Sequence, residues 1–131
     1  MKTTTTWKKI KHQFESRQDH NSLLLDGDKQ NGFSPKALLL SGLAACSGID
    51  VIDILEKMRV PVNGLEIDTA ATQTEEHPRV FKEIDITYKV KTDPANEDKV
   101  RKAIDLSLEK YCGVSAMLKK NSPISYKLVI E

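Results

Sequence analysis

The sequence predicts an α+β fold in which two main helices pack on largely antiparallel strands. Segments in which apolar and polar residues alternate, the pattern of half-buried strands, occur both before and after one long apolar helix. A second helical stripe and a last alternating segment then close the chain. No repeat, linker or composition shift marks a boundary, so we expect residues 1–131 to form a single domain.

The N-terminal third should contain three short strands and the start of the long helix. The strands are separated by polar turn residues, and their expected ranges are 3–9, 11–17 and 22–26. Ser34 followed by Pro35 predicts a helix start, because serine caps free amides and proline at the first helical position needs no N–H. This helix should run to about Arg59, just before Pro61.

The remainder should contain two strands, one or two helices and a final strand. Alternation predicts strands at 65–71 and 84–90, joined by the turn EEHPRV. Asp93 and Pro94 mark the start of the next helix, which we expect Gly113 to end before a short helix restarts at Ser115. The segment ISYKLVI closes the chain as a strand. The predicted order of elements is therefore βββ-α-ββ-α(α)-β.

Charge and composition exclude several classes of function. Twenty basic and 19 acidic residues nearly cancel without a basic run, so nothing predicts a nucleic-acid or membrane partner. The N-terminus has no apolar leader, and we expect no apolar run to reach the roughly 20 residues of a membrane span. The protein is therefore expected to be cytoplasmic, where cysteines stay free or cycle between redox states. His12, His20 and His77 lack metal-ligand spacing, so no metal is expected.

Cys46 lies in the stretch LLLSGLAACSGIDVIDILEKM, which should be helical. At about 100° per residue its side chain falls on a narrow polar stripe, while apolar residues cover most of the remaining circumference. The stripe consists of Gly42, Cys46, Asp50, Asp53 and Lys57. A helix this apolar should be mainly buried, so the stripe is expected to line a cleft or a subunit interface. The alternative is that Cys46 is an inert core residue, and the carboxylate of Asp50 one turn onward works against a thiolate.

Cys112 is the second cysteine of the chain, in EKYCGVSAML. It lies where one helix ends and another restarts, so free N–H groups could surround it and favour a thiolate, although a cysteine there could also simply pack. Two thiols can alternate between dithiol and disulfide if the fold brings them together.

These motifs carry a resemblance to a known family. SPKALLLSGLAAC, followed much later by EKYCGVSAML, resembles the OsmC/Ohr family of osmotically inducible and organic hydroperoxide resistance proteins. The order of elements and the length fit as well, so the resemblance covers essentially the whole chain. SGIDVIDILEKMRV and HPRVFKEIDITYKV are more similar to the OsmC-like branch than to the Ohr branch.

The resemblance implies an OsmC-like fold, an intertwined homodimer and a thiol peroxidase that reduces organic hydroperoxides as part of a stress response. Cys46 would then be the peroxidatic cysteine, which forms a sulfenic acid, and Cys112 the resolving cysteine, which forms a disulfide with it. A cellular dithiol would reduce that disulfide, with no metal or organic cofactor.

The sequence also departs from the family at the residues that activate the thiolate. Family peroxidases use an Arg from the N-terminal strands, held by a Glu before the reactive Cys. Lys36 stands in the place of that Glu, and the Arg has no clear match, although Arg17 lies in a neighbouring strand. Lys36 could itself supply the positive charge or be a solvated residue of the first turn. The alternative function is a noncatalytic dimer that binds a small apolar or electrophilic molecule.

Overall fold

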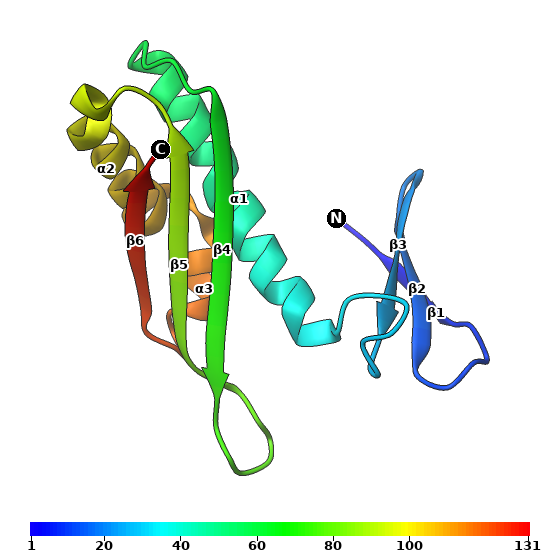
Figure 1. The fold of residues 1–131 in the computed structure, drawn as a ribbon. Coiled ribbons are helices and arrows are strands. Elements are labelled where there is room, and N and C mark those ends of the chain that lie inside the picture. Colours follow the sequence, from blue (N-terminus) through cyan, green and yellow to red (C-terminus); the bar gives the residue numbers. More distant parts are fainter. The chain divides into compact units, whose positions relative to one another are not determined.

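The computed structural model describes all 131 residues and divides them into two compact units, residues 1–40 and 41–131 (Figure 1). The first unit contains the three N-terminal strands and the start of helix α1 (Pro35–Lys57). The second contains the rest of α1 and every later element. The mixed α+β fold with the predicted order of elements is confirmed, whereas the single domain stays a prediction.

The first unit is built on one antiparallel sheet with the strand order β1-β2-β3. The strands are β1 (Thr4–Trp7), β2 (Gln13–Gln18) and β3 (Asn21–Asp26). Trp7 lies opposite Phe14, and Phe14 lies opposite Leu25, so these side chains share one face. Trp7 and Phe14 are 52% and 38% exposed. This sheet therefore carries an apolar face that its own unit leaves open.

The segment from β3 to α1 is organised by the buried carboxylate of Asp26. Its oxygens accept backbone N–H bonds from Asp28 at 2.9 Å, Gln30 at 3.3 Å and Asn31 at 3.0 Å. These bonds, the one from Asp28 above all, lower the pKa of Asp26. At the start of α1 the amide of Ala37 donates to Ser34 Oγ at 3.4 Å, as expected of a capping serine.

The second unit is built on a three-stranded sheet with the order β4-β5-β6. The strands are β4 (Gly64–Gln73), β5 (Phe81–Lys91) and β6 (Ile124–Ile130). The β4–β5 pair is antiparallel, as the turn between them predicts, whereas β5 and β6 are parallel. The prediction of largely antiparallel pairing is correct, with this one parallel pair as its exception.

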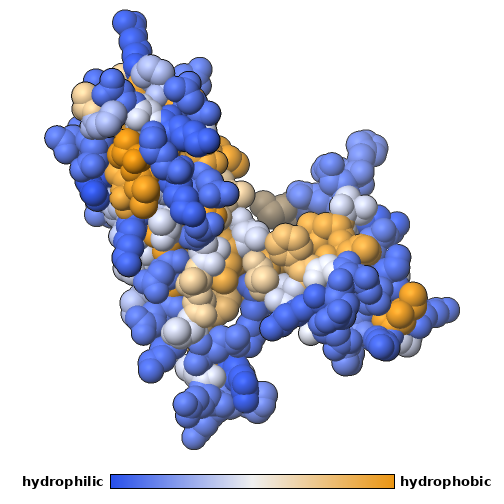
Figure 2. All heavy atoms as spheres, in the orientation of Figure 1, coloured by the Kyte–Doolittle hydropathy of each residue, from blue (hydrophilic) through white to orange (hydrophobic).

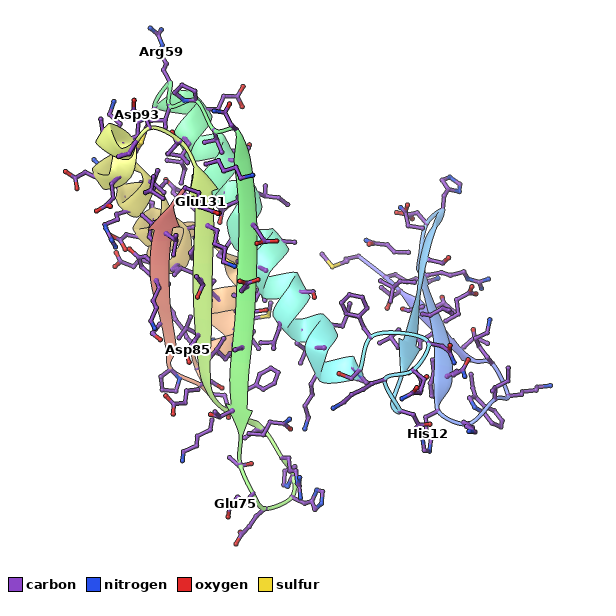
Figure 3. All side chains as sticks on the ribbon, in the orientation of Figure 1. His12, Arg59, Glu75, Asp85, Asp93 and Glu131 are labelled. Carbon is purple, nitrogen blue, oxygen red and sulfur yellow. The ribbon has the colours of Figure 1, made fainter.

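The core of the second unit lies between this sheet and the helices, which cover one of its faces (Figure 1). Alternate residues of the central strand β5 are fully buried: Ile84, Ile86, Tyr88 and Val90. The helices contribute Leu43, Val51, Leu55, Val100, Ala103 and Ile104. The intervening β5 residues form a charged face, which includes Asp85 (Figure 3). On this face Lys89 pairs with Asp68 of β4 at 2.9 Å.

The helical segment after β5 is continuous as far as Tyr111 but changes its geometry. It comprises a 3₁₀ turn (η1, Pro94–Asn96), α2 (Glu97–Leu106) and a π-helical turn (η2, Ser107–Tyr111), followed by α3 (Gly113–Leu118). The prediction that Gly113 ends the helix is wrong, because Gly113 is the first residue of α3. The break falls at Cys112, whose extended backbone (φ −76°, ψ 105°) and N-capping thiol start the new helix.

Helix α1 is less buried than its apolar sequence predicts. Only one face packs on the sheet, while Ile49 and Ile52 remain 64% and 41% exposed. By length and composition alone α1 could cross a membrane, so the expectation that no segment reaches that length is wrong. The core helix of a soluble protein meets the same criteria, which makes this weak support for a membrane span.

Candidate functional site

The fold brings the two cysteines together. Cys46 lies in the middle of α1 and is half-buried, and Cys112 lies between the π-helical turn and α3 and is 3% exposed. Both are free thiols, and they lie close enough together for Cys46 to raise the pKa of the Cys112 thiol. From the sequence alone, Cys112 is only a possible partner of Cys46. In the structure the two cysteines are neighbours. The peroxidatic and resolving roles stay predictions.

Burial dominates the electrostatics of Cys112. Burial raises the pKa of the Cys112 thiol, and the neighbouring Cys46 raises it further. The backbone N–H of Ser115 donates to Cys112 Sγ at 3.4 Å and opposes that rise. The expected free N–H group is therefore present, but it is outweighed by burial. Cys112 is consequently protonated at neutral pH.

A chain of buried polar side chains runs beside the thiols. The hydroxyl oxygens of Ser47 and Tyr88 lie 2.6 Å apart, and Ser107 Oγ lies 2.9 Å from Ser47 Oγ and 3.0 Å from Asp50 Oδ2. Ser47, Tyr88 and Ser107 are fully buried. Four residues from α1, β5 and the π-helical turn are thus joined in one network next to Cys46.

The carboxylate of Asp50 ends this chain. A carboxylate oxygen only accepts, so the hydroxyl of Ser107 is the donor in its contact with Asp50. The same hydroxyl is the donor toward Ser47 Oγ, so its proton is shared between two acceptors. Between Ser47 and Tyr88 either hydroxyl can donate, and no buried side-chain polar atom lacks a partner.

Tyr88 anchors the inner end of the chain. Burial, together with the nearby acidic groups of Cys112 and Asp50, raises the pKa of Tyr88 to about 12. The phenol therefore stays protonated throughout the physiological pH range. Its ring packs edge to face on Tyr126 with the centroids 5.8 Å apart, and this contact fixes its orientation.

The other residues singled out in the sequence lie in different surroundings. Asp50 faces this network and is half-buried, as its place on the polar stripe next to Cys46 led us to expect. Arg17 and Lys36 belong to the first unit, where Arg17 pairs with Glu15 at 4.0 Å. No group of three or more His, Cys, Asp or Glu side chains could hold a metal ion.

The sequence did not reveal Ser47, Tyr88 or Ser107 as part of the site. The alternation of its strand marks Tyr88 only as one of the apolar positions. Ser47 could have been noticed as a lone polar residue on the buried face of α1, next to Cys46 in the chain. Ser107 gave no signal, because a π-helical turn has no recognisable sequence pattern.

An apolar groove runs along α1 beside the site. Its volume is about 580 Å³, and Figure 2 shows apolar atoms at the surface of each unit. The groove is lined by Ser41, Ala44, Ala45, Gly48, Ile49, Ile52, Asp53, Leu65 and Ile67. A second pocket of about 430 Å³ is bounded by Asp50, Asp53, Lys57 and Tyr111 together with apolar residues. Neither pocket is lined by Cys46 or Cys112.

Comparison with known proteins gives consistent matches. The family model of the OsmC-like proteins matches residues 26–127. The chain is 37% identical over 118 residues to protein YhfA of Escherichia coli, covering 88% of this chain and 87% of YhfA. A crystal structure of a hypothetical protein from Aquifex aeolicus is 30% identical, with a TM-score of 0.84 over 99% of this chain and 96% of that one. The organic hydroperoxide resistance protein OhrB of Bacillus subtilis has a TM-score of 0.67 at 19% identity, covering 97% and 96% of the two chains, and this shows a shared fold.

Proposed function

We propose, from the premise that this chain belongs to the OsmC-like protein family, that it is a thiol-dependent peroxidase that reduces organic hydroperoxides. The observation that carries the proposal is the proximity of the thiols of Cys46 and Cys112. They come from elements far apart in the sequence, and they are the only cysteines of the chain. A fold that joins its only two thiols has the parts of a dithiol–disulfide cycle.

The proposed cycle starts at the more accessible thiol. The thiolate of Cys46 attacks the outer oxygen of the hydroperoxide, the O–O bond breaks, and the alkoxide leaves and takes up a proton as an alcohol. Cys46 is thereby oxidised to a sulfenic acid. The sulfur of Cys112 then displaces the hydroxyl group, which leaves as water with the thiol proton, and a disulfide forms. A dithiol reductant restores both thiols and is itself oxidised to a disulfide.

Activation of Cys46 is the step in which this chain departs from its family. Lys36 stands where the peroxidases have their Glu, and Arg17 is the nearest counterpart of their Arg in the sequence. We propose that one of these two cations takes part in peroxide reduction. Replacing each in turn by Met keeps an unbranched side chain and removes the charge. The cation that acts is the one whose loss slows peroxide reduction at least about tenfold.

A homodimer is part of the same proposal. The first unit leaves Trp7, Phe14 and Leu23 exposed, and α1 leaves Ile49 and Ile52 exposed. Exposed apolar groups gathered on defined faces are typical of surfaces that a second subunit covers. We also place the protein in the cytoplasm, where a dithiol reductant is available.

The test is consumption of cumene hydroperoxide in the presence of dihydrolipoamide or dithiothreitol. The wild type should turn over, Cys46→Ser should be inactive, and Cys112→Ser should react once and then accumulate a sulfenic acid. Cys46→Ala/Cys112→Ala serves as the background control. Equal turnover in the wild type and Cys46→Ser would refute a thiol peroxidase.

The apolar groove supports a second candidate, which is noncatalytic binding of a small apolar or electrophilic molecule. A volume of about 580 Å³ lies within the range of small-molecule sites. Titration with an environment-sensitive apolar dye, repeated with Ile49→Asp, distinguishes the candidates. Saturable binding that Ile49→Asp abolishes, in a protein without peroxide turnover, favours this second function.

A further inference from the structure

The π-helical turn holds the backbone of Cys112. In an α-helix each N–H donates to the carbonyl four residues earlier, but the amide of Cys112 donates to the carbonyl of Ser107, five residues earlier, at 2.7 Å. The turn thus contains one extra residue, and Cys112 leaves it with an extended backbone. The position of Cys112 therefore depends on where Ser107 is held.

The side chain of Ser107 is attached to the helix that carries the other thiol. Its hydroxyl lies 2.9 Å from Ser47 Oγ, 3.0 Å from Asp50 Oδ2 and 3.4 Å from the Ser47 carbonyl oxygen. Ser47 directly follows Cys46, and Asp50 lies one turn further along the same helix. Ser107 thus connects the backbone of Cys112 to the turn of α1 that begins at Cys46.

Disulfide formation is sensitive to such a connection. A disulfide needs its two Cα atoms within a window of about 4.4–6.8 Å and its side chains correctly directed, so small displacements of one cysteine change the equilibrium strongly. Ser107 is fully buried, and its bond to a charged acceptor is stronger than a bond between neutral groups. Of the four residues in the network, only Ser107 is also hydrogen-bonded to the backbone of Cys112.

We propose that Ser107 is the positioning residue of the thiol pair: its hydroxyl fixes the π-helical turn to α1 and so holds Cys112 where it can form a disulfide with Cys46. This inference rests on the dithiol–disulfide cycle of the proposed function and names the residue that governs its second step. The role is independent of the peroxide, since Ser107 acts on the relative position of the two cysteines and not on the substrate.

The test is a thiol–disulfide equilibrium with glutathione, which involves no peroxide. The S–S bond of oxidised glutathione breaks as the Cys46–Cys112 bond forms, and the two thiol protons pass to two molecules of reduced glutathione. The measured quantity is the ratio [GSH]²/[GSSG] at which half of the protein is oxidised, where GSH is reduced and GSSG is oxidised glutathione. Acid quenching, alkylation and mass spectrometry give the oxidised fraction of the protein. Ser107→Ala should lower this ratio at least about tenfold.

Two control variants separate positioning from a loss of stability. Tyr88→Phe removes a hydroxyl from the same buried chain but leaves the bonds of Ser107 to Asp50 and Cys112 in place, so its ratio should stay within about twofold of the wild type. Ser107→Thr keeps the hydroxyl, so its glutathione ratio should be closer to that of the wild type than to that of Ser107→Ala. An unchanged ratio in Ser107→Ala, or an equal drop in Tyr88→Phe, overturns the inference, as does a wild type that forms no intramolecular disulfide.

A pair of substitutions at Asp50 tests the same contact if Ser107→Ala does not fold. Asp50→Asn removes the charge but keeps an acceptor for Ser107, whereas Asp50→Ala removes both. The ratio should be lower in Asp50→Ala than in Asp50→Asn, and equal values overturn the inference. If these variants shift the glutathione ratio but the wild type does not turn over peroxide, the inference stands and the peroxidase proposal is rejected. If the wild type turns over peroxide but the variants leave the ratio unshifted, the peroxidase proposal stands and the inference is rejected.

Discussion

The hydroxyl groups of Ser47 and Tyr88 lie 2.6 Å apart in the fully buried core of the second unit. Ser47 comes from the helix that carries Cys46, and Tyr88 comes from the central strand of the sheet. This bond joins α1, at the residue after Cys46, to the central strand of the sheet, whose inward-facing side chains are fully buried. It is therefore expected to contribute to the stability of the second unit.

Ser47→Ala should destabilise the protein by about 1–3 kcal/mol, because the phenol of Tyr88 loses the only partner that the structure gives it inside the core. Urea unfolding followed by circular dichroism measures the change. Ser125→Ala is the matched control, since Ser125 also makes a 2.6 Å side-chain bond, to Asp85, but at an exposed position. That control should stay within about 0.5 kcal/mol of the wild type.

A double-mutant cycle with Tyr88→Phe separates the hydrogen bond from the packing. If the bond itself is stabilising, Ser47→Ala should cost less in the Tyr88→Phe background than in the wild type, by about 0.5–1.5 kcal/mol. Additive effects of the two substitutions would contradict a direct coupling.

The raised pKa of Tyr88 predicts a loss of stability at alkaline pH. In the unfolded chain the phenol ionises near its ordinary value of 10.0, whereas burial keeps it protonated in the fold until about pH 12. Between these values the unfolded state binds fewer protons, so the free energy of unfolding falls as the pH rises and levels off above pH 12. The difference between the wild type and Tyr88→Phe in urea unfolding at pH 9–12 isolates this effect. A difference that does not change with pH would contradict the assignment.

The sequence predicted the fold well because local patterns carried it. Strands alternate with period two, and α1 has a serine cap and a following proline, so their positions followed from short segments. Two features did not follow. The parallel pairing of β5 and β6 depends on a crossover through the C-terminal helices, and the exposure of Ile49 depends on how much of α1 the sheet covers. Neither is encoded in the residues of one element.

The site was predicted only in part, for a related reason. Cys46 and Cys112 could be selected as reactive candidates, and Asp50 as a neighbour, from composition, helical geometry and the family resemblance. Ser107 could not, because its importance comes from a π-helical turn that shifts Cys112 by one residue and from bonds to another helix. Such contacts between distant segments leave no trace in a single sequence.

The two thiols should differ in their reaction with iodoacetamide. Cys46 is half-buried, whereas Cys112 is 3% exposed and burial raises its pKa, so at pH 7 Cys46 should be alkylated at least about tenfold faster. The rate at Cys112 should keep rising with pH above the ordinary thiol value of about 8.5, since its thiolate forms late. Peptide mass spectrometry of timed samples measures both rates, and urea-unfolded protein is the control in which the difference should disappear. Faster labelling of Cys112 in the folded protein would contradict this order.

Two glycines of α1 should respond to substitution in opposite ways. A Cβ added at Gly42 meets nothing within 4 Å, so Gly42→Ala should stabilise the protein by about 0.5–1 kcal/mol. Alanine lowers the conformational entropy of the unfolded chain and has a higher helix propensity than glycine. At the buried Gly48 a Cβ already lies 3.1 Å from the Cδ1 atom of Ile67, so the larger Gly48→Val should cost about 1–3 kcal/mol by overpacking the contact between α1 and β4. Trimming Ile67 to Val should recover part of that cost, because it removes the methyl group that the new side chain meets. Urea unfolding of the three variants measures these changes, and a Gly48→Val protein as stable as Gly42→Ala would mean that α1 does not approach β4 as closely as the structure shows.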